Sequence, residues 1–155
     1  MAKKLLSKRI LPDGGKLFVS EDGAAACQMH HLENGVTLHT CKGTIGVEFA
    51  AEVIADGNQQ LLQHGRCIYM VDCWDSPRMT GEFRDAVVEW MLDALRRYDG
   101  KLEAHLLIRS AVTSMVVGIA NMVLRRKSVK TYSSIPDWTN AGKTHLPLFR
   151  RRPIP

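Results

Sequence analysis

The chain has 155 residues, of which 45% are hydrophobic and 24% are charged, values that are ordinary for a globular protein. This length is sufficient for one domain with a hydrophobic core and too short for two such domains. No apolar run approaches the roughly 18 residues of a membrane-spanning helix, and the N-terminus "MAKKLLSKRI" lacks the apolar region and cleavage site of a secretory signal. We therefore expect no membrane insertion and a cytoplasmic location.

The net charge of +5 is unevenly distributed. Residues 1–10 and 143–155 carry eight basic side chains and no acidic one, so residues 11–142 hold three more acids than bases. The folded body is therefore mildly acidic, and any nucleic-acid binding would have to depend on the two basic ends.

The elements predicted in the first half of the chain are mainly strands. Residues 16–20, "KLFVS", predict a strand. Residues 24–43 predict a β-hairpin, because Asn34-Gly35 supplies the positive φ values of a two-residue turn. Residues 44–65 follow a helical pattern that Gly57 weakens in the middle.

Strands and helices alternate in the second half. The pattern predicts strands over 66–73, 102–110 and 128–133, helices over 80–98 and 111–126, and an irregular tail from Ile135. This alternation is typical of β-α units in a mainly parallel sheet. We therefore predict a single α/β domain over residues 16–138, with an N-terminal antiparallel hairpin leading into a βαβαβ mixed sheet and helices packed mainly on one face. Residues 1–15 are interpreted as a basic extension and residues 139–155 as a basic irregular tail.

The hairpin contains several residues that can bind metals. A two-residue turn at Asn34-Gly35 would place His30, His39 and Cys41 on one face and Cys27 and His31 on the other. A structural zinc site needs four ligands, and this spacing matches no established ligand pattern. The four cysteines also lack CxxC spacing, which indicates reduced thiols. The sequence therefore predicts neither a metal site nor another cofactor.

Catalytic motifs are missing from the sequence. It contains no GxSxG, Walker, GxGxxG or HExxH motif. His105 lies between apolar neighbours and is interpreted as a core histidine. Ser76 and Ser110 follow predicted strands, but no histidine is placed near them by the order of elements. Asp72 and Asp75 could form a carboxylate pair at a strand end, where α/β folds place ligands, but neither metal partners nor a phosphate loop accompany them. We therefore predict no catalytic residues.

The two helices of the second half suggest interaction surfaces. Asp85, Glu89 and Asp93 recur on one face of the helix 81–97, where like charges repel by a few tenths of a kcal/mol. That face is either simply solvated or an acidic docking stripe. The helix 111–126 is apolar nearly all round, so its outer face is covered by another segment, by a partner or by a second copy in a homodimer.

The order of elements and the segment 67–92, "CIYMVDCWDSPRMTGEFRDAVVEWML", resemble the STAS family of anti-sigma-factor antagonists over roughly residues 16–138. In that family an aspartate-bearing loop precedes an Asp-Ser-Ser/Thr-Gly motif at a helix start, and phosphorylation of one serine there switches partner binding. Counting from Asp72, the motif falls on "TGEF" at 80–83, where Glu82 occupies the position of the regulated hydroxyl. The resemblance thus implies the fold and an interaction role, without the phosphorylated serine.

Two other hydroxyls, those of Ser76 and Thr80, are the candidate phosphosites, although Thr80 also fits an N-cap. We predict a non-enzymatic bacterial regulatory or scaffold module that binds a regulatory protein, or itself, through the 73–84 loop and the acidic helix that follows. Alternatives are a nucleic-acid-associated protein acting through its basic ends, and a small enzyme or ligand-binding protein around Asp72, Asp75 and Ser110. The predicted partner-binding residues are Asp75, Ser76, Arg78, Thr80, Glu82, Arg84, Asp85 and Glu89.

Overall fold

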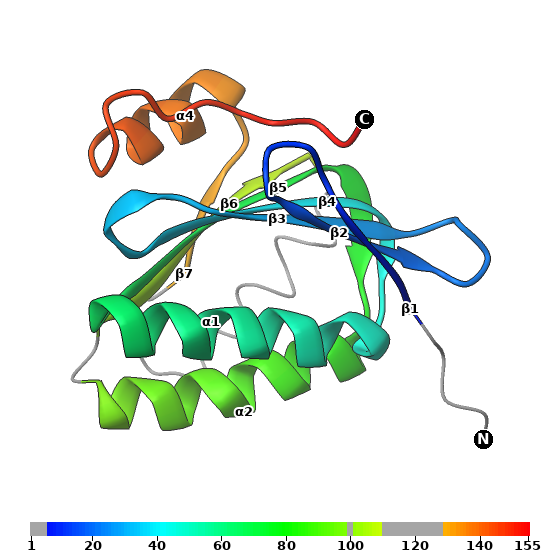
Figure 1. The fold of residues 1–155 in the computed structure, drawn as a ribbon, viewed down its shortest axis with the longest axis horizontal. Helices are drawn as coiled ribbons and strands as arrows, with labels where there is room; N and C mark the ends of the chain where they lie inside the picture. Colours follow the sequence, from blue (N-terminus) through cyan, green and yellow to red (C-terminus); the bar gives the residue numbers. More distant parts are fainter. Residues whose placement is uncertain (1–5, 99–100, 110–128) are drawn as a thin grey trace.

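The computed structural model describes residues 6–98, 101–109 and 129–155, which form a single α/β domain around one seven-stranded mixed sheet (Figure 1). The order of strands in the sheet follows the chain from β1 to β7. The strands are β1 (Leu6–Ile10), β2 (Lys16–Ser20), β3 (Ala26–His31), β4 (Val36–Ile45), β5 (Cys67–Met79), β6 (Leu102–Ile108) and β7 (Val129–Tyr132). The described α-helices are α1 (Ala50–His64), α2 (Gly81–Arg97) and α4 (Ile135–Lys143).

The sheet has an antiparallel half and a parallel half. Strands β1 to β4 pair antiparallel, and β4 to β7 pair parallel. Because crossovers between parallel strands are right-handed, α1 and α2 lie on the same face of the sheet (Figure 1). The predicted fold class is confirmed. The segment around α4 and the C-terminus covers the opposite face.

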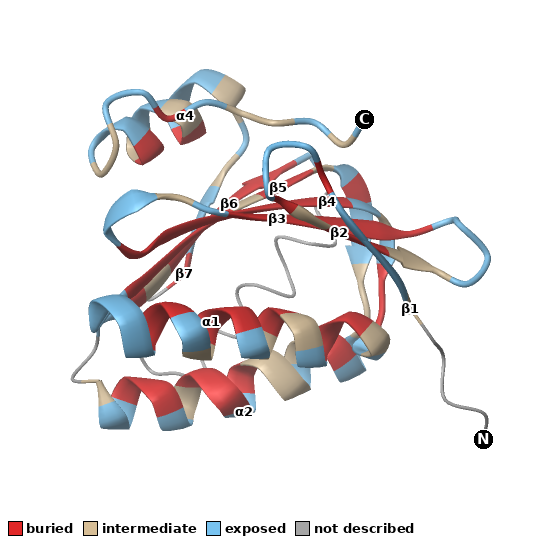
Figure 2. Cartoon of the chain, viewed as in Figure 1, coloured by how far each residue is buried: buried red, intermediate tan, exposed pale blue. Residues whose placement is uncertain are grey.

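Both faces of the central strands are buried, as Figure 2 shows. The larger core lies between the sheet and the helices α1 and α2, and a smaller core lies between the sheet and α4. Strands covered on both faces are apolar at most positions, which is why the first part of β5, residues 67–71, and the end of β6, residues 106–108, are continuous hydrophobic runs. The smaller core contains Val36, Leu38, Ile68, Met70, Leu107, Trp138 and Phe149.

The turn between β3 and β4 differs from the predicted two-residue turn. The Leu32 N–H donates to the Val36 carbonyl at 2.8 Å and encloses a loop of three residues, 33–35. The odd loop length shifts the pairing by one residue, so the predicted grouping of His30 with His39 is wrong. The face toward α1 instead carries Cys27, His31, Thr37, His39 and Cys41.

The predicted 73–84 loop is also largely wrong, because β5 continues to Met79. Strand β4 continues to Ile45 and pairs with β5 as far as Met79, with register shifts after Thr40 and Lys42. Helix α2 then begins at Gly81 after a single linking residue.

The predicted ends of the domain differ from the structure as well. Strand β1, within the expected N-terminal extension, pairs with β2 along its whole length. The tail expected to be irregular begins with α4, because the Ser134 hydroxyl accepts a hydrogen bond from the Asp137 N–H and Pro136 lies in the first turn. The predicted helix 111–126, with the homodimer interface assigned to it, lies outside the described residues. Within the described ranges, no helix has the length and apolar character to cross a membrane.

Candidate interaction site

Helix α2 is anchored at its N-terminus by an N-cap and along its length by its buried face. The Thr80 hydroxyl accepts a hydrogen bond from the Phe83 N–H at 3.2 Å, so Thr80 is the N-cap of the helix. Phe83 is buried in the core beneath the helix, and so is Trp90 two turns later. This anchoring leaves Glu82 and Glu89 exposed to solvent on the other side.

The acidic stripe of α2 is partly neutralised by arginines of the same helix. Asp85 is 2.7 Å from the Arg84 guanidinium, and Asp93 is 2.9 Å from that of Arg97. Within the described part of the chain, Glu82 and Glu89 form no ion pair. The exposed face of α2 therefore presents these two carboxylates uncompensated.

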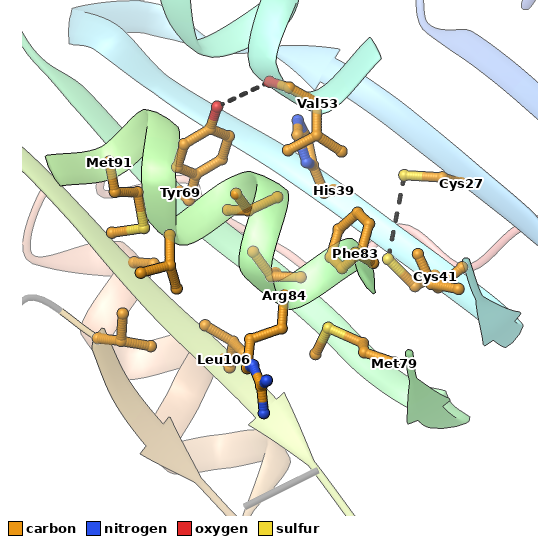
Figure 3. A pocket seen from close by; sticks show the side chains of 16 residues that line it. Cys27, His39, Cys41, Val53, Tyr69, Met79, Phe83, Arg84, Met91 and Leu106 are labelled. Atoms are coloured by element: carbon orange, nitrogen blue, oxygen red, sulfur yellow. Dashed lines mark hydrogen bonds between the residues drawn. The ribbon is translucent and has the colours of Figure 1, made fainter. Parts of the chain in front are cut away.

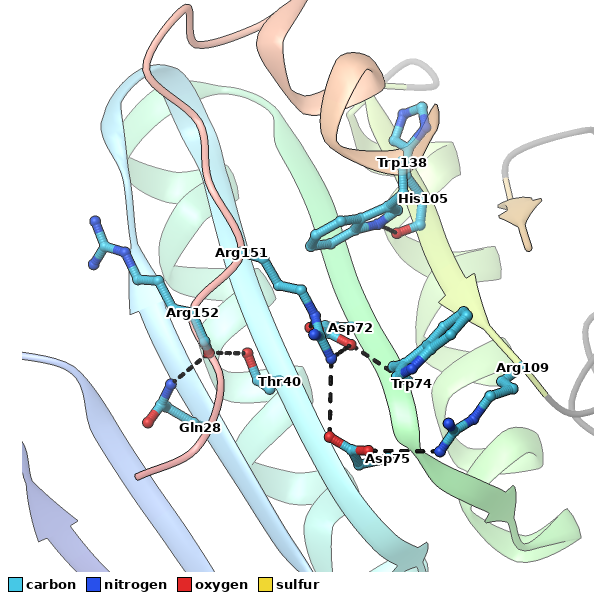
Figure 4. A network of polar contacts seen from close by, with 10 residues as sticks. All are labelled: Gln28, Thr40, Asp72, Trp74, Asp75, His105, Arg109, Trp138, Arg151 and Arg152. Carbon is cyan, nitrogen blue, oxygen red and sulfur yellow. Dashed lines mark hydrogen bonds and ion pairs between the residues drawn. The ribbon is translucent and has the colours of Figure 1, made fainter. Parts of the chain in front are cut away.

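The structure separates Asp75 and Ser76 from the other predicted site residues. Asp75 lies on the sheet face opposite α2, beside Arg109 at 3.6 Å and Arg151 at 3.8 Å (Figure 4). Ser76 is only 1% exposed, and its hydroxyl donates to the Gly43 carbonyl at 2.7 Å. A kinase could reach this serine only if the end of β5 opened. Of the other predicted residues, Arg78 lies near the end of β5, Thr80 caps α2, and Glu82, Arg84, Asp85 and Glu89 lie in the first half of α2.

The C-terminal segment lies along the opposite face of the sheet and is held there by polar contacts (Figure 4). Asp72 is 1% exposed and accepts hydrogen bonds from Arg151 Nε at 2.5 Å and from the Trp74 N–H at 3.0 Å. The Arg152 carbonyl accepts from Gln28 Nε2 at 3.1 Å and Thr40 Oγ1 at 2.9 Å. The tail is therefore part of the folded domain.

These contacts bear on the charge that the tail can offer to a nucleic acid. Arg151 pairs with Asp72, and Arg152 lies 3.7 Å from Asp13. The C-terminal end therefore presents less free positive charge than the composition of residues 143–155 indicates.

A buried polar cluster joins α1 to the hairpin. The Asp56 carboxylate accepts hydrogen bonds from Thr37 Oγ1 and His39 Nε2, each at 2.9 Å, and also contacts His31 Nε2. Burial alone would raise the pKa of Asp56, but the hydrogen bonds and charges of His39 and His31 outweigh it and hold the pKa well below its ordinary value. Asp56 is therefore an ionised carboxylate that fixes the helix to the sheet.

This cluster was not predicted from the sequence, although Gly57 next to Asp56 carried a signal. A Cβ at Gly57 would lie 2.1 Å from Tyr69 Oη and 2.4 Å from the Trp90 ring, so only glycine allows α1 to approach so closely. Tyr69 Oη in turn donates to the Val53 carbonyl at 3.0 Å. A glycine in mid-helix thus marks the close contact of α1 with β5 and α2.

An apolar cavity of about 120 Å³ lies between the sheet and α2 (Figure 3). Arg84 supplies a guanidinium at its edge, and Cys27 and Cys41 face each other across its wall with sulfurs 3.9 Å apart. All four cysteines are free and buried, and burial raises the pKa of the Cys67 thiol. Ligand pockets typically measure about 300–1,000 Å³, so this cavity is too small for a drug-sized molecule.

Comparison with known proteins supports the fold. No family model matches the sequence, and no curated protein matches it. Among solved structures, the chain is similar to an uncharacterized protein of the DUF3478 family from Shewanella loihica PV-4, described as having a SpoIIAA-like fold. The two share 8% sequence identity and a TM-score of 0.51, over 76% of this chain and 93% of that one. The chain therefore has a SpoIIAA-like, that is a STAS-like, fold.

Proposed function

We propose that this protein is a non-enzymatic regulatory or scaffold module that binds a protein partner through the end of β5 and the exposed face of α2. The observation that carries the proposal is the pair of carboxylates of Glu82 and Glu89, which are exposed and have no ion-pair partner among the described residues, on a helix that is anchored by the buried Phe83 and Trp90. A rigid, charged helix loses little conformational freedom on binding and selects a partner of complementary charge. We therefore propose a partner with a basic surface.

The proposed binding mode needs no phosphorylation. The sequence resemblance to STAS domains implies that Glu82 occupies the position of the regulated hydroxyl in that family. Glu82 is exposed in the first turn of α2, where the helix dipole favours negative charge. The Glu82 carboxylate thus gives this surface a permanent negative charge, the sign of charge that a phosphate would introduce. We propose that the surface binds its partner constitutively.

The surroundings of the other candidate groups favour an interaction module over an enzyme. Asp72 is buried against Arg151, and Asp75 lies between two guanidinium groups. The carboxylates at the strand ends are thus engaged within the protein. The free, buried cysteines fit the cytoplasmic location that we propose.

The test is affinity capture of partners from a nuclease-treated lysate, followed by calorimetry with the purified partner. Glu82→Lys/Glu89→Lys should weaken binding at least about 10-fold, which corresponds to about 1.4 kcal/mol. Glu33→Lys is the matched control, because Glu33 is an exposed acid in the β3–β4 turn, at the other end of the parallel strands.

Equal affinity of the double variant and the wild type would refute this binding surface. Loss of every captured protein on nuclease treatment would instead favour the nucleic-acid alternative. Recovery of the chain alone at twice its mass in light scattering would identify a second copy as the partner.

A further inference from the structure

Three side chains with metal-binding atoms converge on the sheet face that α4 covers. Glu103 and His105 are two residues apart on β6 and therefore point to the same face. His145 follows α4 and approaches the same carboxylate oxygen. Glu103 Oε1 is 3.1 Å from His105 Nε2 and 3.3 Å from His145 Nε2. Among the described residues, this is the one group of three such side chains whose ligand atoms all lie within 4.8 Å of one another.

We propose that Glu103, His105 and His145 bind a divalent transition metal of the Zn²⁺ class. Zinc binds imidazole nitrogen and carboxylate oxygen at about 2.0–2.2 Å in tetrahedral geometry. Ligand atoms of such an ion are about 3.3–3.5 Å apart, close to the two distances from Glu103 Oε1. Two histidines and one carboxylate leave the fourth position for water.

His105 is held in place by neighbours that suit a metal ligand. Its Nδ1 is 2.8 Å from the Tyr132 hydroxyl, and its backbone carbonyl accepts a hydrogen bond from Trp138 Nε1 at 2.9 Å. A hydroxyl can either donate or accept, so Tyr132 can accept the Nδ1–H of the tautomer whose Nε2 lone pair faces the ion. Such a partner on the second ring nitrogen is a regular feature of metal-bound histidine.

The site also has suitable charge and access. Glu103 supplies a carboxylate oxygen and the two histidines supply imidazole nitrogens, which are donor types that Zn²⁺ binds. Glu103 is 41% exposed and His145 23% exposed, so an ion can enter from solvent. Once bound, it would link the segment after α4 directly to β6.

The test is the Zn²⁺ affinity of the metal-free full-length chain, measured by competition with a chromophoric chelator. His145→Ala should weaken binding more than about 100-fold, and Tyr132→Phe on the order of 10-fold, because outer partners of ligands typically contribute 10–100-fold. His64→Ala, at an exposed histidine at the end of α1, should leave the affinity unchanged. Zn²⁺ should also raise the Tm of the wild type but not that of His145→Ala.

Two results would overturn the site. The first is a wild-type affinity in a folded His145→Ala variant, with folding checked by circular dichroism. The second is an X-ray absorption spectrum with zinc–sulfur bonds, which would assign the ion to the cysteines. A Glu103→Gln variant provides an independent check, because its neutral amide keeps the hydrogen-bond acceptor but removes the charge that the cation needs.

Discussion

The two faces of the sheet are closed in different ways. On one face, α1 connects β4 to β5 and α2 connects β5 to β6, and the apolar stripes of the two helices form the larger core. On the other face, a segment from the end of the chain reaches back, and Arg151 contacts Asp72 across 79 positions in sequence. The first face depends on local amphipathic pattern, whereas the second depends on specific long-range contacts.

The polar contacts of the two faces differ accordingly. The helix face holds a closed cluster around Asp56, with its charge buried and its acceptors occupied. The tail face carries the buried Asp72 paired with a partly exposed Arg151, and it also carries Glu103 and His145, which are partly exposed to solvent. The charge of the helix face is thus enclosed in the core, whereas the tail face leaves some charged side chains partly exposed.

The largest expected change in the free energy of unfolding comes from core substitutions on the two faces, which test whether the tail face unfolds together with the rest of the domain. Trp138 and Phe49 are each 0% exposed, one on the tail face and one on the helix face. Replacing either by Ala should lower the free energy of unfolding by about 3–5 kcal/mol, measured by urea denaturation. A loss below about 1 kcal/mol for Trp138→Ala alone would show that α4 is a separate, weakly docked cap.

Asp56→Asn should lower the free energy of unfolding by about 2–3 kcal/mol, because a neutral amide replaces a carboxylate that accepts three hydrogen bonds. The folded pKa of Asp56 lies below its ordinary value of 3.8, so its stabilising contribution is present above that pH and is lost as the pH falls further. The wild type should therefore lose more stability on acidification than Asp56→Asn does. Parallel pH profiles of Tm for the two proteins would contradict this assignment.

Arg151→Met should cost about 2 kcal/mol, because it leaves the Asp72 carboxylate buried without its charged partner. Arg150→Met is the matched control, since Arg150 is exposed, and its effect should stay within about 0.5 kcal/mol. Thermal denaturation of both variants gives the comparison. Equal effects would mean that Arg151 contributes only general charge to the tail.

The smallest expected loss of stability comes from removing the N-caps of α2 and α4. Thr80→Ala in α2 and Ser134→Ala in α4 each remove a side chain that accepts a backbone hydrogen bond, at 3.2 Å and 3.4 Å respectively. Each change should cost about 1 kcal/mol in chemical denaturation, with Ser134→Ala no larger than Thr80→Ala. Thr80→Ser should restore most of the loss, since it keeps the hydroxyl.

The sequence predicted the helix face well and the tail face poorly. The apolar stripe of α2, its start at Thr80 and the apolar strands β5 and β6 follow from periodicity and capping residues, which act over a few positions. The predicted hairpin register was wrong because a loop of three rather than two residues shifts the pairing by one residue, which reverses the faces of one strand relative to its partner. The continuation of β5 failed because a polar segment becomes a strand only when β4 pairs beside it.

The candidate binding surface shows the same division. Glu82, Asp85 and Glu89 could be placed on one helix from their spacing, and the structure keeps them there. Asp75 and Ser76 could not be placed, because the register shifts in β5 decide which face each one meets.

The sequence by itself determined the order of strands β2 to β7 with helices α1 and α2 between them, the mixed sheet and the amphipathic character of α2, because backbone preference and hydrophobic period are local properties. Only the tertiary structure decided that the basic tail is folded, that Asp56 meets two histidines, and that Glu103, His105 and His145 converge. The physical reason is distance along the chain. Glu103 and His145 lie 42 positions apart, and a contact of this range depends on how the whole chain packs, which no local pattern encodes.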